Sequence, residues 1–361
     1  MKELSRATLP ANTVVWLDML RGMSAQLVLL GHLSLFRSDT AVLHPAAIQT
    51  IAVVIFYILS GFLIFHTIFN KLPLASYTFT SFFIDRFCRI YPAYVAALLF
   101  VVVIDALHMH FYPLPYAEHG YRYRVVTFIS NLFFLQKINL HQGSFGTADQ
   151  LWSLPPEWWM YMFSGYAVFT LSRKATLSWR HLAILSLLGF APVSFLFHGN
   201  PITGVGMSAL WIFGGIACVF HRFLPVDIHR GNIRILLTYF LIMFLGCACY
   251  RYISTDYGYD MLGAFNLAGA FLCSVWLTHS AGCDVLSRPY VRSASRFLAG
   301  YSFSLYLTHY SLCLLLGYSL PKVLIWLIYN LVAIAFGHVF ERNHRQLATR
   351  LKAAVAGRGR T

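Results

Sequence analysis

The chain has 361 residues, of which 58% are apolar and only 11% are charged, and its mean hydropathy is +0.63. Soluble domains carry about 25% charged residues, so this composition excludes an ordinary soluble domain and indicates a membrane protein. The net charge of +14 does not indicate nucleic-acid binding, because the Lys and Arg residues fall in short runs between apolar segments.

Windows of about 20 mostly apolar residues predict ten membrane-spanning helices. They lie near 14–36, 46–70, 90–110, 151–172, 181–198, 203–222, 235–250, 261–280, 297–317 and 321–340. With the N-terminus inside, 20 of the 27 Lys and Arg residues fall on the cytoplasmic side and 6 outside, as the positive-inside rule favours. We therefore expect an all-α polytopic membrane protein with both termini cytoplasmic. A single transmembrane domain would cover 1–345, and a basic cytoplasmic tail would cover 346–361.

The first predicted helix carries ionisable residues among its apolar ones. Arg21 and His32 are about three helical turns apart, so they share one face and are separated by about 16 Å along the axis. Asp18 lies one turn before Arg21 and can neutralise it. Ionisable groups within spans are costly and often mark function. There are alternatives to a functional role: Asp18 and Arg21 can form an interfacial ion pair, and His32 can make an ordinary polar contact between helices.

The next segments contain small and basic residues. Ser60-Gly61 in the second predicted span allows two helices to approach closely. Just before the third predicted span, Arg86 and Arg89 are one turn apart and can face one anion. Two guanidinium groups suit phosphate recognition; anchoring at the cytoplasmic surface is the alternative.

The longest predicted outside connection covers roughly 111–150 and contains an apolar stretch over 125–135. This stretch is too short to cross a bilayer, so we expect a re-entrant or interfacial segment. Because no connection is of domain size, the helices must carry any chemistry.

Two later helices add polar residues to the candidate site. Glu157 lies near the outer end of the fourth predicted helix, with Tyr161 one turn away on the same face, and an acid beside the hydrocarbon region needs a partner. His309 falls in the outer half of the ninth predicted helix. We therefore expect His32, Glu157 and His309 to lie at overlapping depths.

These residues belong to five motifs in a fixed order. The motifs are Arg21-x10-His32, Leu59-Ser60-Gly61-Phe62, Arg86-x2-Arg89-x2-Pro92, Trp152-Ser153-Leu154-x2-Glu157-x3-Tyr161 and Tyr301-Ser302-x2-Leu305-Tyr306-x2-His309. With the ten-helix pattern, the chain resembles the acyltransferase-3 family of membrane acyltransferases, which includes O-antigen and exopolysaccharide O-acetylases. The resemblance covers Leu17 to about Phe340. Some members add a C-terminal SGNH-type esterase domain, which we do not expect here.

The resemblance implies that His32 is catalytic and that Arg86 and Arg89 bind an acyl-CoA donor, most commonly acetyl-CoA. It implies a multi-pass protein of the bacterial inner membrane that contacts membrane lipid and a carbohydrate or glycolipid acceptor. Neither a metal nor nucleic acid is expected. The residues expected to assist are Arg21, which would line the path of the pantetheine arm, and Asp18, Trp152, Ser153 and Tyr161.

The expected reaction is acyl transfer with His32 as general base, which takes the proton of an acceptor hydroxyl as its oxygen attacks the thioester carbonyl. Glu157 or His309 would orient the imidazole or receive the proton. An acyl-histidine intermediate is the alternative mechanism. A transporter or flippase is a second class that ten helices with buried polar residues would suit, and a non-catalytic envelope scaffold is a third.

Overall fold

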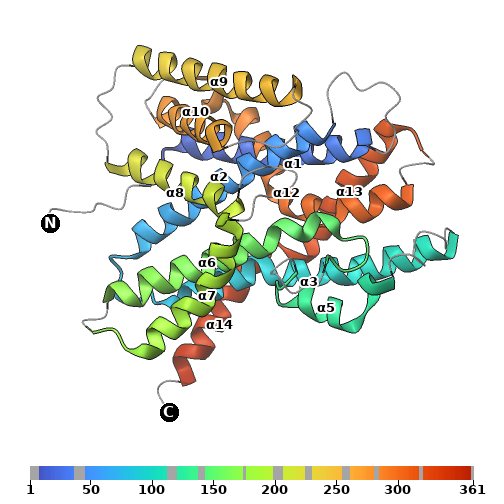
Figure 1. Ribbon diagram of the computed structural model, residues 1–361, viewed down its shortest axis with the longest axis horizontal. Helices are drawn as coiled ribbons and strands as arrows, with labels where there is room; N and C mark the ends of the chain where they lie inside the picture. The colour runs from blue at the N-terminus through green and yellow to red at the C-terminus, as the bar shows by residue number, and fades with distance from the viewer. Residues whose placement is uncertain are drawn as a thin grey trace. The chain divides into compact units, whose positions relative to one another are not determined.

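The computed structural model describes residues 8–35, 45–111, 120–136, 143–173, 176–197, 206–223, 230–253, 261–279, 284–316 and 320–358 (Figure 1). Within these ranges all regular structure is helical, which confirms the all-α class. The α-helices are α1 (Ala11–Leu35), α2 (Pro45–Lys71), α3 (Phe79–Phe111), α5 (Val125–Leu132), α6 (Leu154–Phe169), α7 (Trp179–Phe197), α8 (Met207–Phe223), α9 (Arg230–Ile253), α10 (Met261–His279), α11 (Asp284–Ser287), α12 (Pro289–Leu316), α13 (Lys322–Phe340) and α14 (His344–Arg358). Short 3-10 turns are η1 (Gly120–Tyr123), η2 (Asp149–Ser153) and η3 (Leu171–Arg173).

Each of the ten predicted windows overlaps one helix of the described chain. In the described part of the chain, seven segments are long and apolar enough to cross a membrane: α1, α2, α3, α7, α9, α10 and the α13–α14 region. The helices α6 and α8 have only 16 and 17 residues, and the first turns of α12 carry Arg292 and Arg296. The chain is therefore a helical protein with several candidate spans, while the total of ten and the orientation of the termini stay predictions.

The third helix differs from its prediction. It begins at Phe79 rather than near residue 90, so Arg86 and Arg89 lie inside α3 instead of preceding it. The hydropathy window misses these first turns because the charged residues lower its average. Phe82, which is fully buried, nevertheless anchors the early turns in the core.

The chain forms two compact units, and the first contains residues 1–31, 42–74 and 193–300. Its helices α2 and α8 cross at glycines. A Cβ atom built on Gly61 would lie 2.0 Å from the carbonyl oxygen of Trp211, and one on Gly214 would lie 1.9 Å from that of Ile58. The close approach predicted at Ser60-Gly61 is thus confirmed, because only a hydrogen atom fits between the two backbones.

The second unit contains residues 32–41, 75–192 and 301–361. Here α14 packs against α3, where Ala348 contacts a cluster formed with Ile84 and Cys88. Lys352 Nζ lies 2.5 Å from Asp85 Oδ1, and Tyr77 donates a hydrogen bond of 2.6 Å to the same carboxylate. The segment expected as a tail is therefore helical over its described part and docked by an ion pair.

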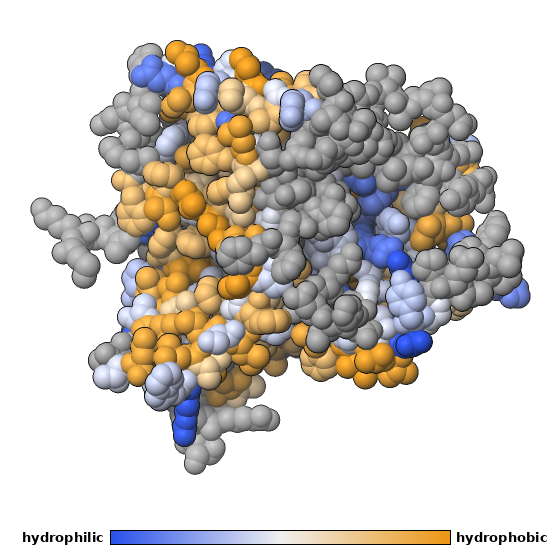
Figure 2. All heavy atoms as spheres, in the orientation of Figure 1, coloured by the Kyte–Doolittle hydropathy of each residue, from blue (hydrophilic) through white to orange (hydrophobic). Residues whose placement is uncertain are grey.

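Apolar side chains cover wide areas of the face seen in Figure 2. On α9, Ile235, Ile242 and Leu245 are each more than half exposed. Such apolar surface is unfavourable in water and suits contact with lipid. The short helix α5 occupies the apolar stretch predicted over 125–135.

Candidate active site

Two histidines from distant parts of the sequence meet in the second unit. His32 lies near the end of α1 and His309 on α12, and their ring centroids are 5.0 Å apart with the planes inclined by 41°. Tyr310 packs edge-on against His32 with a centroid distance of 4.9 Å. The structure therefore brings together the two histidines that the sequence placed at overlapping depth.

The hydrogen bonds of His309 define its tautomer. Its Nδ1 lies 2.9 Å from the carbonyl oxygen of Leu305 and 3.1 Å from that of Tyr306, and a carbonyl oxygen can only accept. Nδ1 must therefore carry the hydrogen, so in the neutral ring Nε2 has a free lone pair. Nε2 of His309 and Nδ1 of His32 are both buried and make no hydrogen bond to any residue that the structure describes. His309 Nε2 is thus a proton acceptor that none of these residues occupies.

Tyr306, one turn before His309 on α12, connects the histidines to the start of α6. The rings of Tyr306 and His309 are 6.1 Å apart. The Tyr306 hydroxyl lies 2.6 Å from Ser153 Oγ and donates to the carbonyl oxygen of Gln150. Gln150 Nε2 in turn donates to the carbonyl oxygen of Leu307 at 2.9 Å. The segment before α6 is therefore bonded along the stretch of α12 that holds His309.

Glu157 faces the same region from the first turn of α6. The Tyr161 hydroxyl donates to Glu157 Oε1, as the one-turn spacing predicted. Glu157 also lies close enough to Tyr306 to act on it electrostatically. Trp152, in η2, is partly buried beside Ser153. Of the predicted residues of this motif, Ser153 and Glu157 thus lie near Tyr306, and Tyr161 is bonded to Glu157.

Arg89 has a partner within the protein. Its Nη1 lies 3.0 Å from Glu341 Oε2, and Glu341, at the end of α13, is only 3% exposed. The hydroxyl of Ser304 on α12 donates to the other oxygen of this carboxylate. Ser304 precedes His309 by five residues, about 7.5 Å along the helix axis. Arg89 is therefore joined through Glu341 to the helix that carries His309.

Arg86 is held differently from Arg89. Its guanidinium lies over the ring of Phe82, 5.7 Å from the centroid, and its buried Nε makes no hydrogen bond. His344 at the start of α14 lies near both arginines. Arg86 is thus the arginine whose hydrogen-bonding capacity is incompletely used.

The remaining predicted pair, Asp18 and Arg21, forms a weak ion pair. Arg21 Nη1 lies 3.7 Å from Asp18 Oδ1, and both side chains are about a quarter exposed. Arg296 adds a second positive charge near Asp18. These residues belong to the first unit, whereas the histidines and the pair Arg86–Arg89 belong to the second.

Sequence reasoning missed three residues of this site: Gln150, Glu341 and, as a site residue, Tyr306. Glu341 carried a readable signal, because it is an acid at the end of an apolar helix and needs a partner. Its pairing with Arg89 spans 252 residues of sequence, so the partner was not readable.

An all-helical chain with several candidate spans and a buried histidine site has the character of a polytopic membrane enzyme. The acyltransferase-3 family model, described as an acyltransferase domain, matches residues 14–340. The chain therefore belongs to this family of membrane acyltransferases. Searches of curated proteins and of solved structures gave no match.

Proposed function

We propose that this protein is an O-acyltransferase of the bacterial inner membrane. It moves an acyl group, most simply acetyl, from acyl-CoA to a hydroxyl of a cell-surface carbohydrate or glycolipid. The observation that carries the proposal is the pair His32–His309: the ring centroids lie 5.0 Å apart, and within the described part of the chain the buried His32 Nδ1 and His309 Nε2 make no hydrogen bond. Such nitrogens suit proton transfer to and from a bound substrate.

In the proposed reaction His32 is the general base. It takes the proton of the acceptor hydroxyl as the oxygen attacks the thioester carbonyl. When the tetrahedral intermediate collapses, the C–S bond breaks, the ester remains on the acceptor, and the proton passes to the departing thiolate of CoA. The lone pair on His309 Nε2 supports a role for His309 as a second proton acceptor rather than as a donor to His32.

The proposed donor site lies at Arg86 and Arg89. Guanidinium groups bind phosphate through paired hydrogen bonds, and CoA carries its phosphates at one end and its thioester at the other. The connection from Arg89 through Glu341 and Ser304 to α12 supports a donor that lies along this helix toward His309. Arg21 is proposed to line the path of the pantetheine arm.

The test measures ester-linked acetate released by mild alkali from the surface polysaccharides of the source organism. A deletion strain is compared with strains that carry wild type, His32→Ala or His338→Ala at equal membrane levels. His338 is the matched control, because it lies on an exposed face of α13. We expect wild type and His338→Ala to restore the acetate and His32→Ala to leave it absent.

Equal acetate in all four strains would contradict O-acetylation of these polysaccharides by this protein. Purified protein in sealed vesicles distinguishes an acyltransferase from the alternative class, a transporter or flippase. Acyl transfer releases free CoA thiol in proportion to ester formed, whereas a flippase moves its substrate without consuming acyl-CoA.

A further inference from the structure

Residues 146–153, the segment that precedes α6, run alongside the part of α12 that carries His309. Its contacts with α12 are made by Thr147, Gln150 and Ser153. Thr147 Oγ1 lies 2.9 Å from Ser311 Oγ, beyond His309, while Gln150 and Ser153 bond at Leu307 and Tyr306, before it. The position of His309 is therefore bracketed by bonds to this segment.

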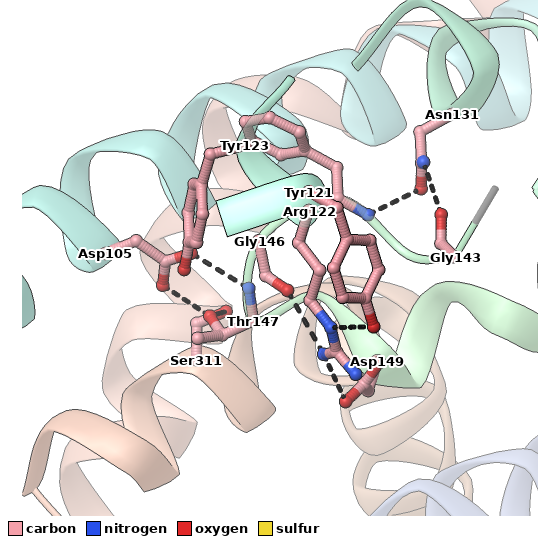
Figure 3. Close-up of polar contacts among 11 residues, drawn as sticks. Asp105, Tyr121, Arg122, Tyr123, Asn131, Gly143, Gly146, Thr147, Asp149 and Ser311 are labelled. Carbon is pink, nitrogen blue, oxygen red and sulfur yellow. Dashed lines mark hydrogen bonds and ion pairs between the residues drawn. The ribbon is translucent and has the colours of Figure 1, made fainter. Parts of the chain in front are cut away.

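The segment is held in turn by a buried acid on α3. Asp105 is only 2% exposed. Its carboxylate accepts hydrogen bonds from the Thr147 backbone N–H at 2.9 Å, from the Thr147 hydroxyl and from the Tyr123 hydroxyl at 3.0 Å (Figure 3). A carboxylate in a membrane-embedded helix is costly, and three donors directed at it compensate that cost.

The fit around Asp105 leaves no spare room. Gly146 has φ +53°, a conformation that favours glycine, and a Cβ built on it would lie 2.3 Å from Asp105 Oδ2. The chain can therefore bring the Thr147 N–H to the carboxylate only with glycine at this position. Figure 3 shows Asp105 and Ser311 next to Thr147.

A second set of bonds ties the segment to the preceding loop. Arg122 Nη1 lies 2.9 Å from Asp149 Oδ2, and Asn131 donates to the carbonyl oxygen of Gly143 at 3.1 Å. The loop also reaches α3 at Tyr94, whose hydroxyl donates to the carbonyl oxygen of Asn131 at 2.7 Å. Asp105 is the α3 residue that bonds the segment itself, at Thr147.

We propose that Asp105 is a positioning residue that holds the segment 146–153 against α12 and so keeps His309 and Tyr306 in place for catalysis. Asp105 acts through Thr147 and does not touch the substrate. This inference rests on the proposed function, because it assigns Asp105 a role in the same acyl transfer.

The test uses the full chain in lipid nanodiscs, with acetyl-CoA as donor, surface polysaccharide of the source organism as acceptor and CoA thiol release as the measured rate. Asp105→Ala is expected to lower kcat by about 100-fold, since small displacements of catalytic groups have effects of that size. The KM for acetyl-CoA should change less than about twofold, because Arg86 and Arg89 lie elsewhere on α3. Tyr123→Phe, which removes one donor of three, should have a smaller effect on kcat.

A rescue separates positioning from general loss of folding. Thr147→Cys and Ser311→Cys, placed together in the Asp105→Ala protein, replace two hydroxyl groups whose oxygen atoms lie 2.9 Å apart, so that oxidation can be tested for a disulfide between them. Oxidation is expected to restore most of kcat and reduction to abolish it again, while either single cysteine variant restores nothing.

Full activity in Asp105→Ala, with His32→Ala inactive, would overturn the positioning role and leave the proposed function intact. A disulfide that forms, as seen by mass spectrometry, without recovery of kcat would also overturn it. Full activity in His32→Ala would instead contradict the proposed function itself.

Discussion

The imidazole rings of His32 and His309 lie 5.0 Å apart, and the Nδ1 of His309 is committed to carbonyl oxygens of its own helix. The second ring therefore has a fixed orientation and a fixed tautomer, and its remaining nitrogen is the accepting one. This relationship yields a sharp prediction.

We expect His309→Asn to fold and to be inactive. An asparagine amide can donate to the carbonyl four residues earlier, as Asn266 and Asn330 do in this protein, but it has no counterpart of Nε2. The kcat should fall by about 100-fold or more, the range that proton-transfer groups contribute. CoA thiol release measures the rate and thermal unfolding in detergent measures stability. A kcat within about threefold of wild type would contradict the acceptor role.

The two arginines of α3 should respond differently to substitution. Arg89→Gln leaves the carboxylate of Glu341, 3% exposed, without its charge partner, and we expect a loss of about 3–5 kcal/mol in unfolding free energy. Arg86→Gln should leave stability nearly unchanged and raise the KM for acyl-CoA about tenfold or more.

Thermal unfolding and initial rates at varied acyl-CoA separate these two effects. The double variant Arg89→Gln with Glu341→Gln serves as the control, because it removes both charges and should recover much of the lost stability. If Arg86→Gln and Arg89→Gln have the same unfolding temperature and the same KM, the distinction is wrong.

The crossing of α2 and α8 should tolerate no side chain. Gly214→Val is expected to cost at least about 3 kcal/mol, because its new atoms meet the backbone of Ile58 and neither helix can move away without losing its packing. Gly246→Val on α9 is the matched control, since a Cβ there meets nothing within 4 Å. Folded yield after membrane extraction is the measurement, and equal yields would contradict the prediction.

The docking of α14 should depend on one lysine. Lys352→Met removes the ion pair with Asp85, whereas Arg350→Met changes an exposed residue of the same helix. Burial and the hydrogen bond to Asp85 raise the pKa of Tyr77, so its phenol stays protonated and donates to this carboxylate. The positive charge of the ion pair comes from Lys352. We expect faster proteolysis of α14 in Lys352→Met only, measured by limited trypsin digestion of purified protein. Equal cleavage rates in both variants would count against the ion pair.

Much of the fold was predictable because hydropathy over 20 residues reports helices directly. The start of α3 was not predictable, because Asp85, Arg86 and Arg89 lower the local mean hydropathy although Phe82 packs in the core. Individual polar residues such as His32, His309 and Glu157 were predictable from their cost in a membrane.

Partners far apart in the sequence were not predictable. The pairing of Arg89 with Glu341 depends on how α3 and α13 meet, and periodicity within one helix carries no information about that. Asp105 and Gln150 were missed for the same reason, because their importance lies in a loop that returns to another helix.

The carboxylate of Glu341 has a consequence for turnover. It already binds Arg89, so a donor phosphate that draws this guanidinium away must leave a buried negative charge short of its counterion. Binding of the proposed donor would then replace the Glu341 carboxylate by a phosphate as the partner of Arg89. The cost of leaving Glu341 unpaired would cancel part of the free energy of donor binding. If CoA is the donor that binds there, its departure lets Glu341 re-form the ion pair with Arg89, and the proposed site then favours rapid product release over tight retention.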